Sequence, residues 1–146
     1  MAITRKANAH WKGSAKEGEG KLNSQSDFFQ DTPYSFQSRF ENEDGKKGTN
    51  PEELIAAAHS GCYAMALSVA IGKAGFEPDY LDVDAKVKLE QDDSGFSISQ
   101  IQLKLEGKVE GMEKDQFIEL AEGAKKGCPI SKALDAVPIE LEASFK

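Results

Sequence analysis

One stretch of this chain, from position 54 to position 72, carries no charged residue and constrains the fold more than any other feature. Asn50 just before it suits a helix N-cap, and Pro51 suits the first helical position. Glu53 lies three residues after Asn50, as in a capping box. The pattern predicts one long helix that begins near Pro51 and runs to about Lys73.

This predicted helix is apolar on every side, which is typical of a buried central helix or of a membrane span. Its length is near the lower limit for crossing a membrane. Six of its residues are alanine, and His59, Ser60 and Ser68 interrupt the rest. Such a weakly apolar segment favours a protein interior over lipid. We therefore expect a buried central helix and no membrane partner.

The residues before the helix favour β-structure. Three strands are predicted, at residues 7–11, 21–26 and 33–40. A glycine-rich turn separates the first two, which predicts a hairpin. The third carries the bulky side chains of Tyr34, Phe36 and Phe40. A charged segment at 41–48, which contains glycine and no apolar residue, predicts a mobile loop.

The residues after the helix alternate in polarity. Apolar side chains recur at every second position from Leu81 to Leu89, which predicts a half-buried strand. A turn at residues 93–95 follows it. The remaining predicted elements are a strand at 96–105, a helix at 113–126 and a strand at 139–145. This order predicts an α+β fold, with antiparallel sheets around the central helix, in a single domain spanning residues 1–146.

The charge of the chain narrows the range of its partners. The formal net charge is −7 at pH 7, the pI is about 4.9, and basic residues form no run longer than two. These values argue against nucleic acid or an anionic membrane surface as a partner. The N-terminal residues lack the apolar core of a signal peptide, which predicts a cytoplasmic protein.

The two cysteines stand in different settings. Cys62 lies inside the uncharged helix, whereas Cys128 precedes Pro129 and suits the N-cap of a short helix that runs to Leu134. Neither belongs to a CxxC motif or a zinc-like His/Cys group, so no metal or cofactor is expected. The settings favour an attacking and a resolving thiol, although two unrelated buried cysteines would also fit. Either sulfur suits the attack on electrostatic grounds, because a helix N-terminus favours the thiolate of Cys128.

Cys62 needs a nearby cation in order to ionise, because burial in an apolar helix raises the pKa of a thiol. The chain has two arginines, Arg5 and Arg39, and Arg39 ends the third predicted strand. Arg39 is therefore the candidate that activates Cys62, although a surface arginine would also fit. His59 precedes Cys62 by three residues on the same helix face. We expect packing or an indirect role for His59, because this spacing rarely gives the geometry of a general base.

Three segments of the sequence resemble the osmotically inducible protein C (OsmC) family, and they are similar to the related organic hydroperoxide resistance proteins. The segments are PYSFQSRF at 33–40, KGTNPEELIAAAHSGC at 47–62 and GCPIS at 127–131. The resemblance extends from Ala9 to the final strand. Arg39 and His59 place the chain on the OsmC branch of the resemblance.

This resemblance implies a thiol-dependent peroxidase that reduces hydroperoxides, preferentially organic ones, as part of a stress response. Cys62 attacks, Arg39 and Glu52 form its electrostatic network, and Cys128 resolves the oxidised product. The resemblance also implies an intertwined homodimer and an external dithiol reductant, of the lipoyl type. Two alternatives stay open: a thiol-disulfide carrier, and a small-molecule-binding protein of the same fold.

The position of Glu52 carries a consequence for assembly. Glu52 and Cys62 are ten residues apart on the predicted helix, and at ~1.5 Å per residue they lie about 15 Å apart along its axis. No glutamate side chain covers that distance. If both belong to one active site, Glu52 comes from a second chain across a two-fold axis. We therefore expect an obligate homodimer with two shared sites.

Overall fold

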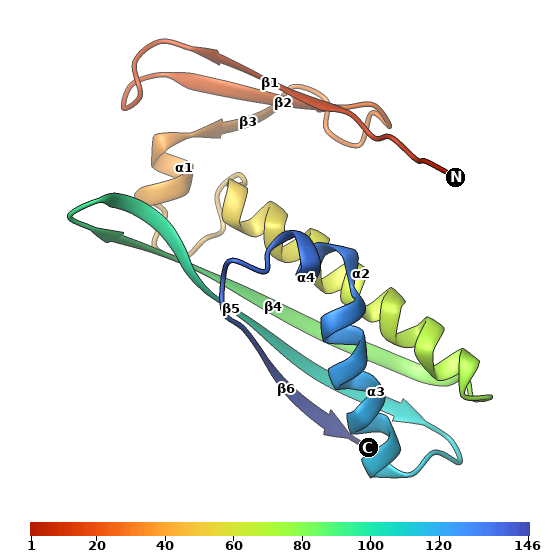
Figure 1. Ribbon diagram of the computed structural model, residues 1–146. Coiled ribbons are helices and arrows are strands. Elements are labelled where there is room, and N and C mark those ends of the chain that lie inside the picture. The colour runs from red at the N-terminus through yellow and green to blue at the C-terminus, as the bar shows by residue number, and fades with distance from the viewer. The chain divides into compact units, whose positions relative to one another are not determined.

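Two three-stranded sheets and one long helix dominate the computed structural model, which describes residues 1–146 (Figure 1). The chain forms two units, Met1–Pro51 and Glu52–Lys146. The elements of the first unit are β1 (Ala7–Lys12), β2 (Glu19–Ser24), β3 (Thr32–Ser35) and α1 (Phe36–Phe40). Those that follow are α2 (Pro51–Lys73), β4 (Pro78–Asp92), β5 (Gly95–Val109), α3 (Lys114–Gly127), α4 (Pro129–Ala133) and β6 (Ile139–Phe145). The α+β class predicted from the sequence is confirmed.

The first sheet is antiparallel, with strand order β1-β2-β3. Gly20 in the central strand stands opposite Trp11 on one side and Tyr34 on the other. A Cβ atom at Gly20 would collide with both aromatic rings, whose centroids lie 5.5 Å apart. The glycine therefore allows the two rings to meet across the sheet, and the predicted hairpin of β1 and β2 is confirmed.

The third predicted strand was too long, because its second half is the helix α1. Ser35 is the N-cap: its hydroxyl accepts a hydrogen bond from the Ser38 N–H at 3.1 Å, and Ser38 Oγ accepts one from the Ser35 N–H at 2.9 Å. This reciprocal pair is a capping box. Phe36 and Phe40 then pack their rings 4.7 Å apart, one helical turn from each other. Consequently Arg39 lies in the last turn of α1 and does not end a strand.

Helix α2 has the predicted bounds and is unbroken from Pro51 to Lys73. Gly75, with a φ of +89°, follows its end, a backbone conformation that favours glycine. The expectation that this helix is buried on all sides was wrong for the single chain. Its fully buried residues form one stripe at four-residue intervals, namely His59, Tyr63, Leu67 and Ile71.

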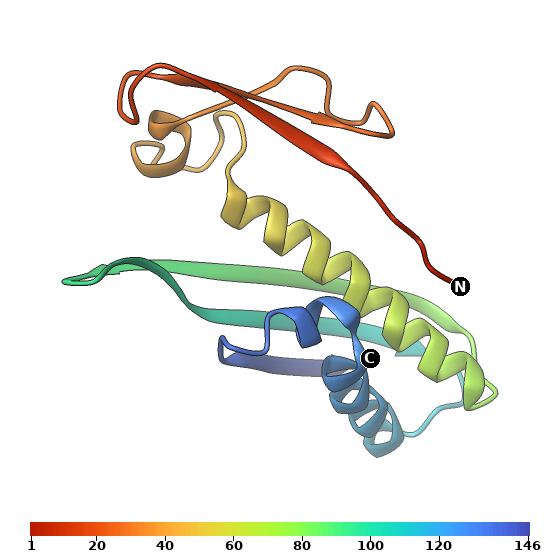
Figure 2. The ribbon, with the colours of Figure 1, turned by 45° about the horizontal axis from the view of Figure 1, so that its top comes forward.

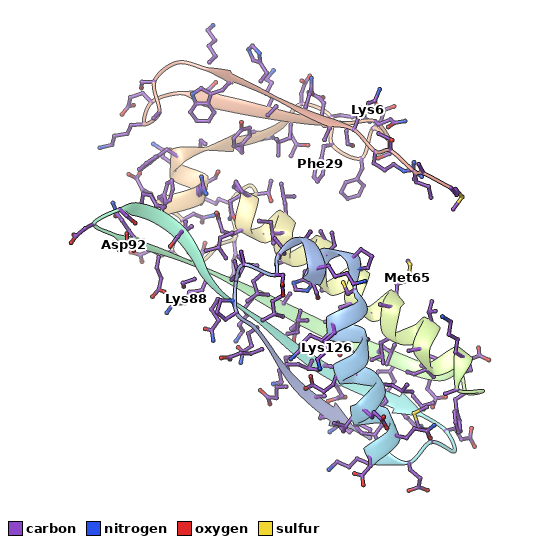
Figure 3. The ribbon with its side chains drawn as sticks, viewed as in Figure 1. Lys6, Phe29, Met65, Lys88, Asp92 and Lys126 are labelled. Carbon is purple, nitrogen blue, oxygen red and sulfur yellow. The ribbon has the colours of Figure 1, made fainter.

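The opposite face of α2 is exposed. Met65 is 71% exposed and Val69 is 53% exposed, and Figure 3 shows the Met65 side chain pointing outward from α2. By length and composition alone, α2 is apolar enough to cross a membrane. Its buried stripe nevertheless belongs to the hydrophobic core of the second unit, as in the central helix of a soluble fold.

The second sheet has the strand order β4-β5-β6. Strands β4 and β5 form a long antiparallel hairpin, in which Asp92 Oδ1 accepts hydrogen bonds from the Ser94 N–H at 2.7 Å and hydroxyl at 2.6 Å. β6 pairs with β5 in parallel, which corrects the prediction of purely antiparallel sheets. The helices α3 and α4 lie between these two strands in the chain and supply the crossover that a parallel pair requires.

The core of the second unit lies between this sheet and the helices α2 and α3, which cover the same face (Figure 2). Residues of β5 alternate between buried and more exposed positions, with Ile101, Leu103 and Leu105 pointing to the core. Phe117 of α3 is fully buried and approaches Gly107, where a Cβ atom would collide with its ring. The glycine at position 107 of β5 therefore allows α3 to pack closely against the sheet.

Candidate active site

Cys62 and Cys128, which are 66 residues apart in the sequence, meet in the second unit. Their Sγ atoms lie 3.0 Å apart, and both thiols are free. Cys62 is partly exposed on α2, next to the buried stripe of that helix, whereas Cys128 is fully buried. The structure therefore brings together the two sulfurs that the sequence singled out, and it excludes two distant, unrelated cysteines.

Cys128 owes its position to the junction between α3 and α4. Its N–H donates to Ala124 O at 2.9 Å, which continues the last turn of α3. Its carbonyl accepts the Lys132 N–H at 3.0 Å, which opens α4. Pro129 occupies the first position of α4, where its missing N–H costs nothing. The prediction that Cys128 is the N-cap of a short helix is confirmed.

The two thiols influence each other's ionisation. Burial raises the pKa of Cys62, and its hydrogen bond with Cys128 raises it further. Burial also opposes ionisation of Cys128, but its hydrogen bond with Cys62 and its interactions with Ser131 and Ile130 outweigh burial and lower the pKa of Cys128. Within this pair the negative charge is therefore more stable on Cys128 than on Cys62.

Access to solvent favours Cys62 as the sulfur that attacks a substrate. Cys62 lines an open groove of about 860 Å³ between α2 and α3, whereas Cys128 is not among the residues that line it. The groove walls are mostly small or apolar, formed by Met65, Ala66, Val69, Ala70, Leu120, Gly123, Ala124, Gly127 and Pro129. Lys73, Glu119, Glu122 and Lys126 complete the lining. A molecule that enters from solvent therefore reaches Cys62 and not Cys128.

The neighbours of Cys62 on α2 divide between this groove and the core. Tyr63 and Leu67 are fully buried in the core and do not face the groove. The Tyr63 hydroxyl donates to Ala121 O at 3.0 Å and so ties α2 to α3 beneath Cys62. Met65, by contrast, lines the groove.

His59 does not act on Cys62 as a general base in this arrangement. Its Nε2 lies 2.7 Å from the Ser131 Oγ, and its Nδ1 is buried without a hydrogen-bond partner. Both side chains are buried, with exposed fractions of 0% and 4%. Sequence reasoning missed Ser131 as a site residue. Ser131 is the third residue after Cys128, in the first turn of α4, and this spacing could have identified it as a neighbour of the thiol.

The two other predicted site residues, Arg39 and Glu52, precede Cys62 in the sequence. Glu52 is in the first turn of α2, ten residues before Cys62, or about 15 Å away along the helix axis. Arg39 lies in α1 of the first unit, with its guanidinium carbon 5.0 Å from the centroid of the Phe40 ring. Their participation in the site stays a prediction. No group of three or more His, Cys, Asp and Glu side chains is arranged to hold a metal ion.

Comparison with known proteins gives a consistent result. The family model described as OsmC-like protein matches residues 43–142. The peroxiredoxin OsmC of Escherichia coli is 46% identical over 136 residues, which cover 93% of each chain. The organic hydroperoxide resistance protein OhrB of Bacillus subtilis is 32% identical over 102 residues, which cover 68% of this chain and 72% of the relative.

Solved structures show the same architecture. The crystal structure of the Bacillus subtilis OhrB protein has a TM-score of 0.72 at 28% identity, covering 97% of this chain and 98% of that one. An OsmC-like protein of unknown function from Vibrio cholerae has a TM-score of 0.76 at 16% identity, covering 98% of this chain and 100% of that one. The second likeness concerns the fold alone. Taken with the family match and the paired thiols, these relatives show that the chain belongs to the OsmC-like protein family.

Proposed function

We propose that this protein is a cysteine-based peroxidase that reduces hydroperoxides, preferentially organic ones. The observation that carries the proposal is the pair of sulfurs 3.0 Å apart, one facing a largely apolar groove and the other buried behind it. This arrangement suits a reaction in which the first sulfur meets the peroxide and the second closes a disulfide. The names of the relatives, a peroxiredoxin and organic hydroperoxide resistance proteins, support the same activity.

The reaction proceeds in two steps. The Cys62 thiolate attacks the terminal oxygen of the hydroperoxide, the O–O bond breaks, and the alkoxide leaves and takes up a proton to become an alcohol. Cys62 is then a sulfenic acid. The Cys128 thiolate attacks the Cys62 sulfur, the S–O bond breaks, and hydroxide leaves and is protonated to water. An external dithiol, of the lipoyl type, reduces the resulting disulfide by exchange.

The first step requires that negative charge moves from the buried sulfur to the exposed one. Within the pair the charge is more stable on Cys128, so a cation on the Cys62 side is needed to favour attack. We assign this role to Arg39, which keeps its charge in an apolar environment, with Glu52 orienting the guanidinium. Arg39 also stabilises the negative charge that develops on the leaving oxygen.

The proposal includes a homodimer in which each site draws Glu52 from the partner chain. Helix α2 is continuous, so Glu52 and Cys62 of one chain remain about 15 Å apart along its axis. The exposed apolar residues Met65 and Val69 of α2 suit packing against a second copy, which would then form part of the wall of the groove beside Cys62. We further propose one OsmC-like domain over residues 1–146 and a cytoplasmic location, with neither nucleic acid nor membrane as a partner.

Stopped-flow oxidation of the reduced protein tests this function. We expect an organic hydroperoxide such as cumene hydroperoxide to oxidise the protein far faster than it oxidises free cysteine, and one alcohol to form for each disulfide. A thiol-disulfide carrier would exchange with protein disulfides and ignore the peroxide. A small-molecule-binding protein would react with neither. Oxidation no faster than that of free cysteine would exclude the peroxidase.

We expect Arg39→Ala to raise the pKa of Cys62 and to slow peroxide reduction tenfold or more, with the fold retained. Arg39→Lys should recover only part of the rate, because the planar two-pronged donor is lost. Arg5→Ala is the matched control, since Arg5 is exposed and its guanidinium bonds only the neighbouring Thr4 O. Thiol titration and stopped-flow kinetics measure both effects. A titration of Cys62 that is unchanged in Arg39→Ala would remove Arg39 from the mechanism.

A further inference from the structure

A chain of hydrogen-bonding groups extends from the reactive sulfurs into the core. His59 Nε2 lies 2.7 Å from Ser131 Oγ. Ser131 stands in the first turn of α4, three residues after its N-cap Cys128, and its hydroxyl and N–H lower the pKa of Cys128. Cys128 lies 3.0 Å from Cys62. This series of hydrogen-bonding groups begins and ends on α2 and passes through α4. His59, Ser131 and Cys128 are all buried.

The position of the proton on His59 decides which group donates in the hydrogen bond between His59 and Ser131. Burial lowers the pKa of His59, so the ring is neutral and carries one N–H. Its Nδ1 is buried and has no hydrogen-bond partner. A buried N–H without an acceptor is rarer in proteins than a buried lone pair without a donor. The proton therefore belongs on Nε2, where it is donated to Ser131 Oγ.

This tautomer leaves the Ser131 hydroxyl proton free to point at sulfur. Because Ser131 Oγ already accepts from His59, its own hydrogen is available to Cys128, together with the Ser131 N–H. The other titratable groups that interact with Cys128 are Cys62 and Tyr63 of α2. The Tyr63 hydroxyl donates its proton to Ala121 O and not to sulfur. Ser131 is thus the hydroxyl donor that serves the Cys128 thiolate.

We propose that His59 and Ser131 are positioning residues for the second chemical step, in which they hold Cys128 as a thiolate aimed at the oxidised Cys62. The proposal rests on the peroxidase function given above. After Cys62 becomes a sulfenic acid, Cys128 supplies the electron pair that forms the S–S bond, and hydroxide leaves from Cys62. A Cys128 thiolate that Ser131 stabilises persists until this attack. Neither His59 nor Ser131 is needed for the attack of Cys62 on peroxide.

Single-turnover kinetics of matched variants test the inference. Reduced protein is mixed with one equivalent of cumene hydroperoxide between pH 5 and pH 9. Sulfenic acid is trapped with dimedone, and disulfide is quantified after acid quench. Ser131→Ala and His59→Leu should slow disulfide formation about tenfold at neutral pH, the scale of one lost hydrogen bond to a charged group. Both should move its pH profile upward. The rate of sulfenic acid formation should not fall, because a less stable Cys128 thiolate leaves more of the negative charge on Cys62.

Two conservative replacements separate hydrogen bonding from packing. The amide nitrogen of His59→Gln reaches about as far as Nε2 and should restore most of the disulfide rate, whereas that of His59→Asn stops near the Nδ1 position and should not. Ser60→Ala removes a neighbouring hydroxyl that bonds only Ala57 O, and it should behave like the wild type. Equal rates in the Gln, Asn and Leu variants, or an unshifted pH profile in Ser131→Ala, would overturn the inference.

Nitrogen-15 NMR of the unmodified, reduced protein gives a test that needs no substitution and no peroxide. We expect a neutral His59 with its proton on Nε2 at pH 7 and above. A proton on Nδ1, or a charged ring near neutral pH, would contradict the proposed chain. If the wild-type protein failed to reduce hydroperoxides, the proposed function would be wrong. The His59 tautomer and the thiol titration of Cys128 in Ser131→Ala would still test whether His59 and Ser131 stabilise the Cys128 thiolate.

Discussion

Replacement of Cys62 by serine should abolish hydroperoxide reduction, with a loss of about a thousandfold or more in rate. Cys62 is the sulfur that lines the groove, and Cys128 is fully buried behind it. A serine hydroxyl does not ionise near neutral pH and is a poor nucleophile towards peroxide. Stopped-flow kinetics with cumene hydroperoxide measures the loss, and thermal unfolding verifies that the variant folds.

Cys128→Ser provides the contrasting control. This variant keeps the attacking sulfur, so we expect one rapid turnover with peroxide and then an arrested state. The arrested product should be the sulfenic acid of Cys62 or a more oxidised form, detected by dimedone trapping and mass spectrometry. If Cys62→Ser retained the activity and Cys128→Ser lost the first turnover, the assignment of attacking and resolving sulfurs would be reversed.

The disulfide itself gives an independent check of the pair. Peroxide treatment of the wild-type protein should join Cys62 to Cys128 within one chain, because their sulfurs already lie 3.0 Å apart. The Cα atoms should then be within about 7 Å of each other. A disulfide that joined two chains through Cys62 would show that Cys128 is not the resolving residue.

A mixed dimer of Cys62→Ser and Glu52→Ala chains should recover activity that both parent dimers lack. If Glu52 acts on the partner's Cys62, one site of the mixed dimer loses both groups and the other site retains both. We therefore expect about half of the wild-type rate per dimer, against a loss of about a thousandfold in the Cys62→Ser parent and about tenfold or more in the Glu52→Ala parent. The reason is the unbroken course of α2, which keeps Glu52 from its own Cys62.

Differently tagged chains, mixed and purified through both tags, provide the mixed dimer for this experiment. The control pairs Cys62→Ser with Glu53→Ala, which removes the neighbouring glutamate instead. The site of this dimer that keeps both Cys62 and Glu52 should be as active as the intact site of the first mixture. If the first mixture is as inactive as its parents while the control mixture is active, the shared-site model is wrong. A monomeric wild-type protein in solution would also contradict it.

Local sequence patterns predicted most of the second unit. The N-cap, proline and glutamate at its start gave α2 its correct beginning, and alternating polarity located β4, β5 and β6. These features depend on residues that are neighbours in the sequence, so they can be predicted from the sequence alone. The same reasoning was wrong for residues 36–40, where aromatic residues suggested a strand. There the capping box of Ser35 and Ser38 favours a helix, and Phe36 and Phe40 pack one turn apart.

The family resemblance and the importance of both cysteines also came from the sequence, because the motifs around Cys62 and Cys128 are short and contiguous. The family is confirmed by the match over residues 43–142 and by relatives that cover nearly the whole chain. The roles of Arg39 and Glu52 stay predictions. They depend on how chains and units assemble, which no local pattern specifies.

Only the tertiary structure decided how the site is built. Which sulfur faces the groove, and which is buried, depends on the packing of α2 against the α3–α4 junction. The same packing places Ser131 against His59, a contact between residues 72 positions apart. It also makes β6 parallel to β5 and leaves one face of α2 exposed. Neighbours along the chain set secondary structure, but the approach of distant side chains depends on the packing of whole elements, and the chemistry of Cys62 and Cys128 depends on that approach.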